Sequence, residues 1–272
     1  MKRNTFGAWF IMFLGAVYFI VPLIGTFEFS LRLRREGYSL EAYQNVVNDP
    51  RFIASFGYSL LIALAVIIVG ILIVVPTAYW VQLRLPQLRG LVEFVTLLPL
   101  VIPAIVLVFG LLRIYGRYAI RLAEFQFLGL DVDVQTSDLF LMFGYVVLAL
   151  PYLYRAVDTG LRSIDVRTLT EAAQSLGASW GTILFRVILP NIRVGILSGA
   201  FLSLAIVVGE FTMASLWNRP AFGVYMQNIG ANRAYEPAAL AIVSFALTWS
   251  SIGLIQFLGR GAPGQTPVSG GR

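Results

Sequence analysis

The chain has 272 residues, of which 58% are hydrophobic and only 12% are charged. A soluble domain carries about 25% charged residues, so this composition argues against a soluble globular fold. Cysteine and histidine are both absent, which argues against disulfides, thiolate nucleophiles, the usual zinc sites and Ser-His-Asp catalysis. The net charge of +6 comes from arginines scattered between apolar segments, as expected for loops at a membrane surface and not for a nucleic-acid-binding protein.

Long uncharged runs predict an all-α membrane protein with about six transmembrane helices. A helix needs about 20 apolar residues to cross the hydrocarbon core. The expected spans are 8–26, 56–79, 92–112, 138–155, 193–212 and 237–258. Together they form one transmembrane domain over 1–260. The segment 261–272 is rich in Gly, Pro and Ser, and we expect it to be a disordered tail.

The first run is too long for the apolar core of a cleaved signal peptide and indicates a membrane anchor. With six spans both termini lie on one side, and a small excess of Lys and Arg on that side favours the cytoplasm. In the third span, Pro99 and Pro103 predict a kink. Beyond it, Arg113, Arg117 and Arg121 recur every four residues, which predicts a short interfacial helix with its arginines on one face.

The loop between the fourth and fifth spans, residues 157–190, contains a short predicted helix. Asp165 or Ser163 can cap its start, the segment 166–176 consists of helix-forming residues, and Gly177 suits the left-handed conformation that ends many helices. The apolar residues of this helix recur at i, i+3, i+4 and i+7, as Leu169, Ala172, Ala173 and Leu176. Such a narrow stripe with small central residues can dock into a groove of a soluble partner.

The same loop carries a family resemblance. Three residues separate Glu171-Ala172-Ala173 from Gly177, and nine more separate Gly177 from Val187-Ile188-Leu189-Pro190. This spacing resembles the EAA loop of ABC-type importer permeases, although that loop usually has Ile where this chain has Val187. The resemblance implies the type I importer permease fold, with the loop forming a coupling helix for an ATP-binding subunit. The coupling residues that it implies are Glu171, Ala172, Ala173, Leu176, Gly177, Leu189 and Pro190.

The resemblance also implies the partners. The chain has no phosphate-binding loop of the G-x-x-x-x-G-K-[ST] type. We therefore expect it to be no enzyme itself and to bind no cofactor or metal, with ATP and Mg bound by a separate ATPase. The expected assembly lies in the bacterial inner membrane. It contains two copies of the ATP-binding subunit, a second and different permease, and an extracytoplasmic solute-binding protein.

Candidate pathway residues are Glu210, Trp217, Tyr225 and Tyr235. Glu210 follows a long uncharged run, where a carboxylate is costly in lipid, so it serves either as a gate or substrate residue or as a hydrogen-bonded helix end. The chain resembles the spermidine/putrescine permeases most, with relatives that handle phosphonates, ferric iron or thiamine, and a pathway carboxylate favours a polyamine cargo. A secondary transporter or channel independent of ATP is the alternative, but it does not explain the 157–190 loop.

Overall fold

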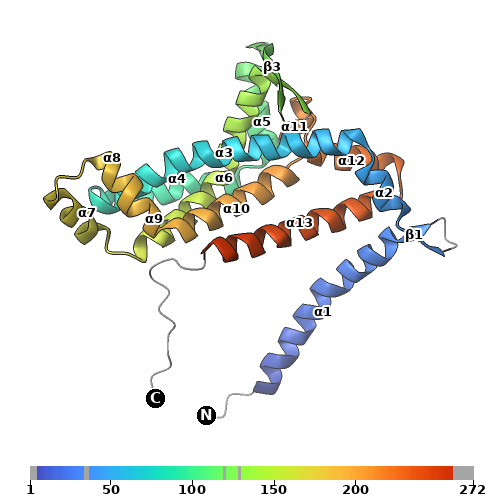
Figure 1. The fold of residues 1–272 in the computed structure, drawn as a ribbon, viewed down its shortest axis with the longest axis horizontal. Coiled ribbons are helices and arrows are strands. Elements are labelled where there is room, and N and C mark those ends of the chain that lie inside the picture. The colour runs from blue at the N-terminus through green and yellow to red at the C-terminus, as the bar shows by residue number, and fades with distance from the viewer. Residues whose placement is uncertain (1–4, 34–36, 119–120, 128–129, 260–272) are drawn as a thin grey trace. The chain divides into compact units, whose positions relative to one another are not determined.

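The computed structural model describes residues 5–33, 37–118, 121–127 and 130–259 (Figure 1). The predicted tail 261–272 lies outside these residues. The chain divides into two compact units, one formed by residues 1–53 and 225–249 and the other by residues 54–224 and 250–272.

The first unit joins the two ends of the chain. It contains α1 (Thr5–Ser30), α2 (Glu41–Val47), most of α12 (Phe222–Asn232) and of α13 (Glu236–Gly259), and the antiparallel pair of β1 (Arg32–Leu33) and β2 (Gly37–Tyr38). Most described side chains of α1 are exposed, and they are almost all apolar. Lipid or a partner helix must cover such a surface in a membrane protein.

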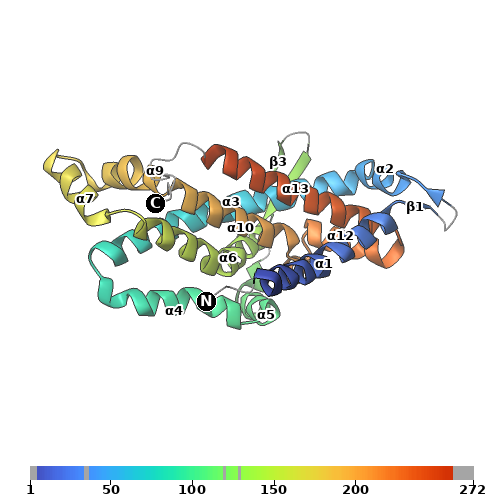
Figure 2. The ribbon, with the colours of Figure 1, turned by 90° about the horizontal axis from the view of Figure 1, so that it is seen from below.

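The second unit is a layered helical bundle. Its long helices are α3 (Pro50–Leu83), α4 (Arg89–Val101), α5 (Ala104–Tyr115), α6 (Thr136–Arg162) and α10 (Arg193–Gly209). Its shorter elements are η1 (Pro86–Leu88), η2 (Gly116–Tyr118), β3 (Arg121–Phe127), β4 (Leu130–Gln135), α7 (Val166–Ser175), α8 (Trp180–Thr182), the π-helix η3 (Ile183–Ile188), α9 (Leu189–Asn191) and α11 (Thr212–Leu216). Both views show α10 running beside α6 (Figures 1 and 2).

Among the described residues, three helices are long and apolar enough to cross a membrane: Trp9–Ser30 of α1, all of α3 and all of α6. Two sharply bent pairs raise the number to five if each counts as one span: Pro86–Val101 with Ala104–Tyr118, and Trp180–Asn191 with Arg193–Gly209. In α13, which holds the sixth expected span, the shorter stretch Glu236–Leu247 is apolar. The total of six spans therefore stays a prediction.

The bend in the third expected span occurs at Pro103. The helices on its two sides differ in direction by 96°. Ile102 is extended, with φ −86° and ψ 117°, and Pro103 precedes the first residue of α5. A proline ring disfavours helical backbone at the preceding residue, which explains why α4 ends here. Pro99 lies inside α4.

The prediction of a helical face with three arginines is wrong. Arg113 lies in the last turn of α5, Arg117 lies in η2, and Arg121 begins β3. Apolar and polar residues alternate from Ala123 to Phe127, and Arg121–Phe127 pairs with β4 as an antiparallel hairpin. Its period of two, typical of a strand, outweighs the spacing of the arginines.

Close packing of α6 on α10 depends on small residues. A Cβ atom added at Gly195 of α10 would lie 2.7 Å from the backbone oxygen of Ala156 and 3.4 Å from the Cα atom of Gly160, both on α6. Gly199, one turn further along α10, meets Leu153 and Ala156 in the same way. Small residues let helix backbones approach closely in a membrane, so these two helices form the centre of the bundle.

Candidate functional site: the 157–190 loop and the spans beside it

The helix predicted in the 157–190 loop is present as α7, and both of its predicted ends are confirmed. The Asp165 carboxylate accepts hydrogen bonds from the Thr168 backbone nitrogen at 3.1 Å and from the Thr168 hydroxyl at 2.7 Å. These bonds lower the pKa of the Asp165 carboxyl. Gly177 has φ +77°, the left-handed conformation that costs any other L-residue about 1–2 kcal/mol.

One face of α7 is fixed to the bundle. Val166, Thr170 and Ala173 are buried, and Val166 and Ala173 belong to the hydrophobic core. The Thr170 hydroxyl lies 3.0 Å from the hydroxyl of Tyr79 on α3. Because Thr170 donates its only hydroxyl hydrogen to the Val166 carbonyl at 2.6 Å, Tyr79 must be the donor to Thr170.

The opposite face of α7 is exposed in the described structure. Glu171 and Ala172 are exposed, and Leu176 is 89% exposed. Glu171 forms an ion pair with Arg167 at 2.8 Å, but both side chains are largely in solvent, so the pair contributes little stability. The predicted apolar stripe is therefore divided: Ala173 packs inward, Leu169 is half-buried, and Ala172 and Leu176 point outward.

After Gly177 the chain turns back toward α3. Ser179 caps α8 by accepting a bond from the Thr182 backbone nitrogen, as its position predicts. The ring of Trp180 lies 5.0 Å from that of Trp80, and the Arg84 guanidinium stands 5.7 Å above the Trp180 ring. Sequence reasoning missed this contact and the Tyr79–Thr170 bond; Tyr79-Trp80 at the end of an apolar run was the only available signal.

The second half of the loop joins α10 through a bend. Residues Ile183–Ile188 form a π-helix, and Ile183 and Ile188 are fully buried. Leu189 packs against the core, while Pro190 is exposed inside α9. The direction changes by 78° before Arg193–Gly209. Pro190, the last residue of the predicted loop, therefore lies within a few residues of the observed bend.

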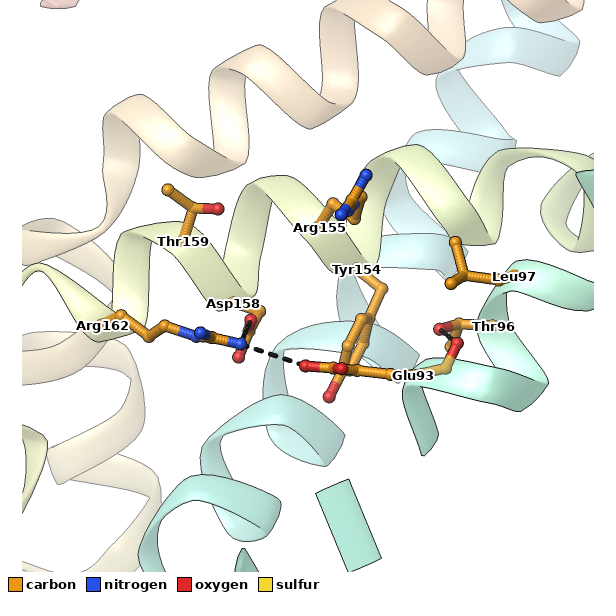
Figure 3. A pocket seen from close by; sticks show the side chains of 8 residues that line it. All are labelled: Glu93, Thr96, Leu97, Tyr154, Arg155, Asp158, Thr159 and Arg162. Carbon is orange, nitrogen blue, oxygen red and sulfur yellow. Dashed lines mark hydrogen bonds and ion pairs between the residues drawn. The ribbon is translucent and has the colours of Figure 1, made fainter. Parts of the chain in front are cut away.

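A network of four charged residues connects α4 and α6 beside this loop. Arg89 bonds Glu93 at 3.0 Å and Asp158 at 3.1 Å, and Arg162 bonds the same two carboxylates at 3.0 and 2.8 Å. Figure 3 shows Glu93, Asp158 and Arg162 beside Tyr154 along a pocket of about 370 Å³. Each carboxylate has two cationic partners, so the network is neutral and fully paired.

The carboxylate of Glu210 is hydrogen-bonded within the protein. It ends α10, and its carboxylate accepts bonds from the backbone nitrogens of Met213 at 3.0 Å and Ala214 at 3.4 Å, at the start of α11. The hydroxyl of Tyr145 on α6 donates a further bond at 2.9 Å. This arrangement corresponds to the second of the two roles considered for Glu210, a hydrogen-bonded helix end.

The turn after α11 contains a buried ion pair that the sequence did not reveal. Arg219 bonds Asp138 through two nitrogens at 2.6 and 2.9 Å, with side chains only 7% and 6% exposed. Tyr58 on α3 donates a hydrogen bond to the same carboxylate, and Arg219 lies over its ring. The pair fixes this turn to the first turn of α6. In the sequence, both residues are isolated charges near span ends, which is only a weak indication that they pair.

The three aromatic pathway candidates also make contacts within the protein. Trp217 is buried and its ring lies 5.7 Å from that of Phe140. Tyr225 and Tyr235 belong to the other unit. There the Tyr225 hydroxyl bonds Asp49 at 3.3 Å, and burial together with that carboxylate raises the pKa of Tyr225 to about 12. The ring of Tyr235 packs against Phe29 at 5.1 Å.

Curated relatives of the chain include a spermidine/putrescine transport system permease protein, PotB of Haemophilus influenzae. It is 29% identical over 65% of this chain and 63% of its own length, so the match spans less than two thirds of that relative. The molybdenum transport system permease protein ModB of Azotobacter vinelandii is 32% identical over 50% of this chain and 59% of its own length. The molybdate/tungstate transport system permease protein WtpB of Pyrococcus furiosus is 29% identical over 91% of this chain and 94% of its own length.

A solved bacterial ABC transporter that imports the acidic polysaccharide alginate has a similar fold. The TM-score is 0.65 at 16% sequence identity, over 94% of this chain and 98% of the matched chain. Residues 75–260, which include the whole 157–190 loop, match the family described as binding-protein-dependent transport system inner membrane component. The chain belongs to that family of integral inner-membrane permeases and has the type I ABC importer permease fold.

Proposed function

We propose that this chain is the permease subunit of an ATP-driven importer and is coupled to a separate ATPase through the 157–190 loop. The observation that supports the proposal most is the two-sided character of α7. Its inner face bonds to α3 through Tyr79 and Thr170, and Val166 and Ala173 on that face are buried in the core. Its outer face presents Ala172 and an almost fully exposed Leu176. An exposed leucine on an anchored helix is suited to a groove in a partner.

The contacts to α3 give this loop a mechanical role. A displacement of α7 and α8 acts on the end of α3 through Thr170 and Trp180, and on α10 through the π-helix and the bend that follows it. The paired network of Arg89, Glu93, Asp158 and Arg162 connects α4 to α6 at the same end. Movement of the loop would therefore reach four spans of the bundle at once.

The partners that we propose follow from the family. They are two ATP-binding subunits that hold ATP and Mg, a second permease and an extracytoplasmic solute-binding protein. A related alginate transporter was solved with a periplasmic protein bound to an alginate pentasaccharide, which supports the last of these. In this arrangement both termini and the 157–190 loop lie in the cytoplasm.

The relatives are named for different cargoes: one for the polyamines spermidine and putrescine, and another for molybdate and tungstate. The preference for a polyamine came from the resemblance to spermidine/putrescine permeases and was supported by Glu210 as a candidate pathway carboxylate. In the structure this carboxylate accepts bonds from Met213, Ala214 and Tyr145, which leaves it poorly suited to a cation. We propose a small charged solute as the cargo, and Glu210 as the residue that orders α11.

Reconstitution of the whole importer in proteoliposomes tests the coupling. We expect Glu171→Lys and Gly177→Leu to abolish ATP hydrolysis stimulated by the loaded binding protein, with the permease still in the membrane. The first reverses a charge on the exposed face, and the second places a bulky residue at φ +77°. The matched control is Glu41→Lys in α2, another exposed glutamate. Normal ATP-driven uptake in both loop variants would contradict the proposal, and uptake that depends only on an ion gradient would favour a secondary transporter.

A further inference from the structure

A groove with a cavity volume of about 710 Å³ lies between α4, α6 and α10. Its floor consists of Ala156, Gly160 and Gly195, the small residues through which α6 and α10 approach each other. None of these three residues has a side chain larger than a methyl group, so they leave space between the helices.

Arg155 is the only charged residue that lines this groove in the described part of the chain. It lies seven residues before Arg162, the last residue of α6, and hence about 10 Å inside the helix end at 1.5 Å per residue. A cation within a span costs up to about 2.5–3.5 kcal/mol in lipid, and such residues usually face a partner or an aqueous pathway. Arg155 is exposed, and no ion pair or hydrogen bond involves it among the residues that the structure describes.

The neighbouring carboxylates do not neutralise Arg155. It also borders the pocket that contains Glu93 and Asp158, but both of these bond Arg89 and Arg162. Figure 3 shows Arg155 and Thr159 on the opposite side of α6 from the Tyr154 ring and Glu93. The positive charge of Arg155 is therefore in excess where the two cavities meet.

Thr159 adds a hydroxyl to this position. It lies one turn after Arg155 on the same side of α6, is exposed, and lines the same groove. A guanidinium beside a hydroxyl can donate several hydrogen bonds to one carboxylate or oxyanion, and charge-assisted bonds of this kind are the stronger ones. A polyamine would meet only repulsion from Arg155.

We propose that Arg155, assisted by Thr159, binds an anionic cargo in the groove between α4, α6 and α10. The inference rests on the proposed importer function and specifies the substrate class. The cargo it implies is a small oxyanion or carboxylate that passes Arg155 on its way through the membrane. Arg155 would then replace part of the hydration that the anion loses in the groove.

The test uses the complete importer with its own binding protein. A panel of molybdate, sulfate, phosphate, small carboxylates, putrescine and spermidine is first screened by melting shifts of the binding protein, and the ligand found is then used for uptake by proteoliposomes. For an anion, we expect Arg155→Gln to lower the rate of anion uptake at limiting concentration by about tenfold or more, which is the effect on binding of losing one charge-assisted bond. Arg155→Lys should retain most of the transport, and the exposed Arg117→Gln should match the unmodified protein.

Four results would overturn this inference: a cationic or neutral cargo, equal uptake by Arg155→Gln, an effect seen only in vesicles that contain anionic lipid, or loss of permease pairing in Arg155→Gln alone. The third would assign Arg155 to a lipid headgroup, and the fourth to the interface with the second permease. None of the four affects the proposed coupling, because that is decided by the Glu171 and Gly177 variants and by ATP dependence.

Discussion

The hydrogen bond from Tyr79 to Thr170 gives the sharpest prediction about how the 157–190 loop is held. Thr170→Val preserves the shape of the side chain but removes the acceptor, and it leaves the hydroxyl of Tyr79, which is only 1% exposed, without its partner in the described bundle. An unsatisfied buried donor costs about 1–3 kcal/mol. The opening equilibrium of α7 should therefore rise about 5- to 150-fold, since each 1.4 kcal/mol is a factor of ten.

Hydrogen exchange of the peptide Val166–Ser175 in the purified importer without nucleotide measures this opening. Tyr79→Phe should have a smaller effect, because Thr170 keeps its bond to the Val166 carbonyl. In the double variant, the loss of α7 opening free energy should be smaller than the sum of the two single losses. The reason is that the Tyr79 hydroxyl, the donor left unpaired in Thr170→Val, is then absent. Unchanged exchange in Thr170→Val, or strictly additive effects in the double variant, would refute the reasoning.

Removal of one partner of the buried Asp138–Arg219 pair should cause the largest loss of stability. Asp138→Asn is expected to lower the free energy of unfolding by about 3–5 kcal/mol, measured by denaturant unfolding in detergent. The double variant with Arg219→Met should recover part of this loss. Gly195→Ala places a Cβ atom 2.7 Å from the Ala156 oxygen and should cost about 1–3 kcal/mol. Gly110→Ala, which meets nothing within 4 Å, is its control, and equal melting temperatures would contradict the packing account. Asp165→Ala should speed hydrogen exchange in α7 several-fold, while Asp165→Asn retains a cap. The pKa of Asp165 in the folded protein is lowered from 3.8. Its charged carboxylate therefore stabilises α7 above about pH 4, and this stabilisation is lost as pH falls through the lowered pKa. Asp165→Asn should lack this acid-dependent change in α7 exchange, and an identical pH profile would contradict the assignment.

The elements that sequence predicts well are those with a local cause. Asp165 and Gly177 define the ends of α7 through capping and backbone conformation, and Pro103 breaks the third span because of its ring. In each case the residue itself imposes the local geometry. These features need no knowledge of what lies across the bundle.

The features that sequence does not predict depend on tertiary contacts. The stripe of α7 looked like one docking face, but Ala173 turns inward because Thr170, on the same side, bonds Tyr79 from a distant helix. The sequence left two roles open for Glu210, and only the structure shows that its carboxylate accepts bonds from Tyr145 and from the start of α11. Arg113, Arg117 and Arg121 fitted a helical period, yet the alternating pattern after Arg121 forms a hairpin. Which partner a polar group finds is decided by packing, and one sequence does not reveal it.

We propose that the outer face of α7 is a cytoplasmic docking surface for an ATPase. The chain contains no cysteine, so Leu176→Cys introduces a single label at an 89% exposed position. With a membrane-impermeant maleimide, we predict rapid labelling in inside-out vesicles that lack the ATPase, none in right-side-out vesicles, and protection when the ATPase subunits are bound. Labelling from the extracytoplasmic side, or labelling that bound ATPase leaves unchanged, would contradict the account.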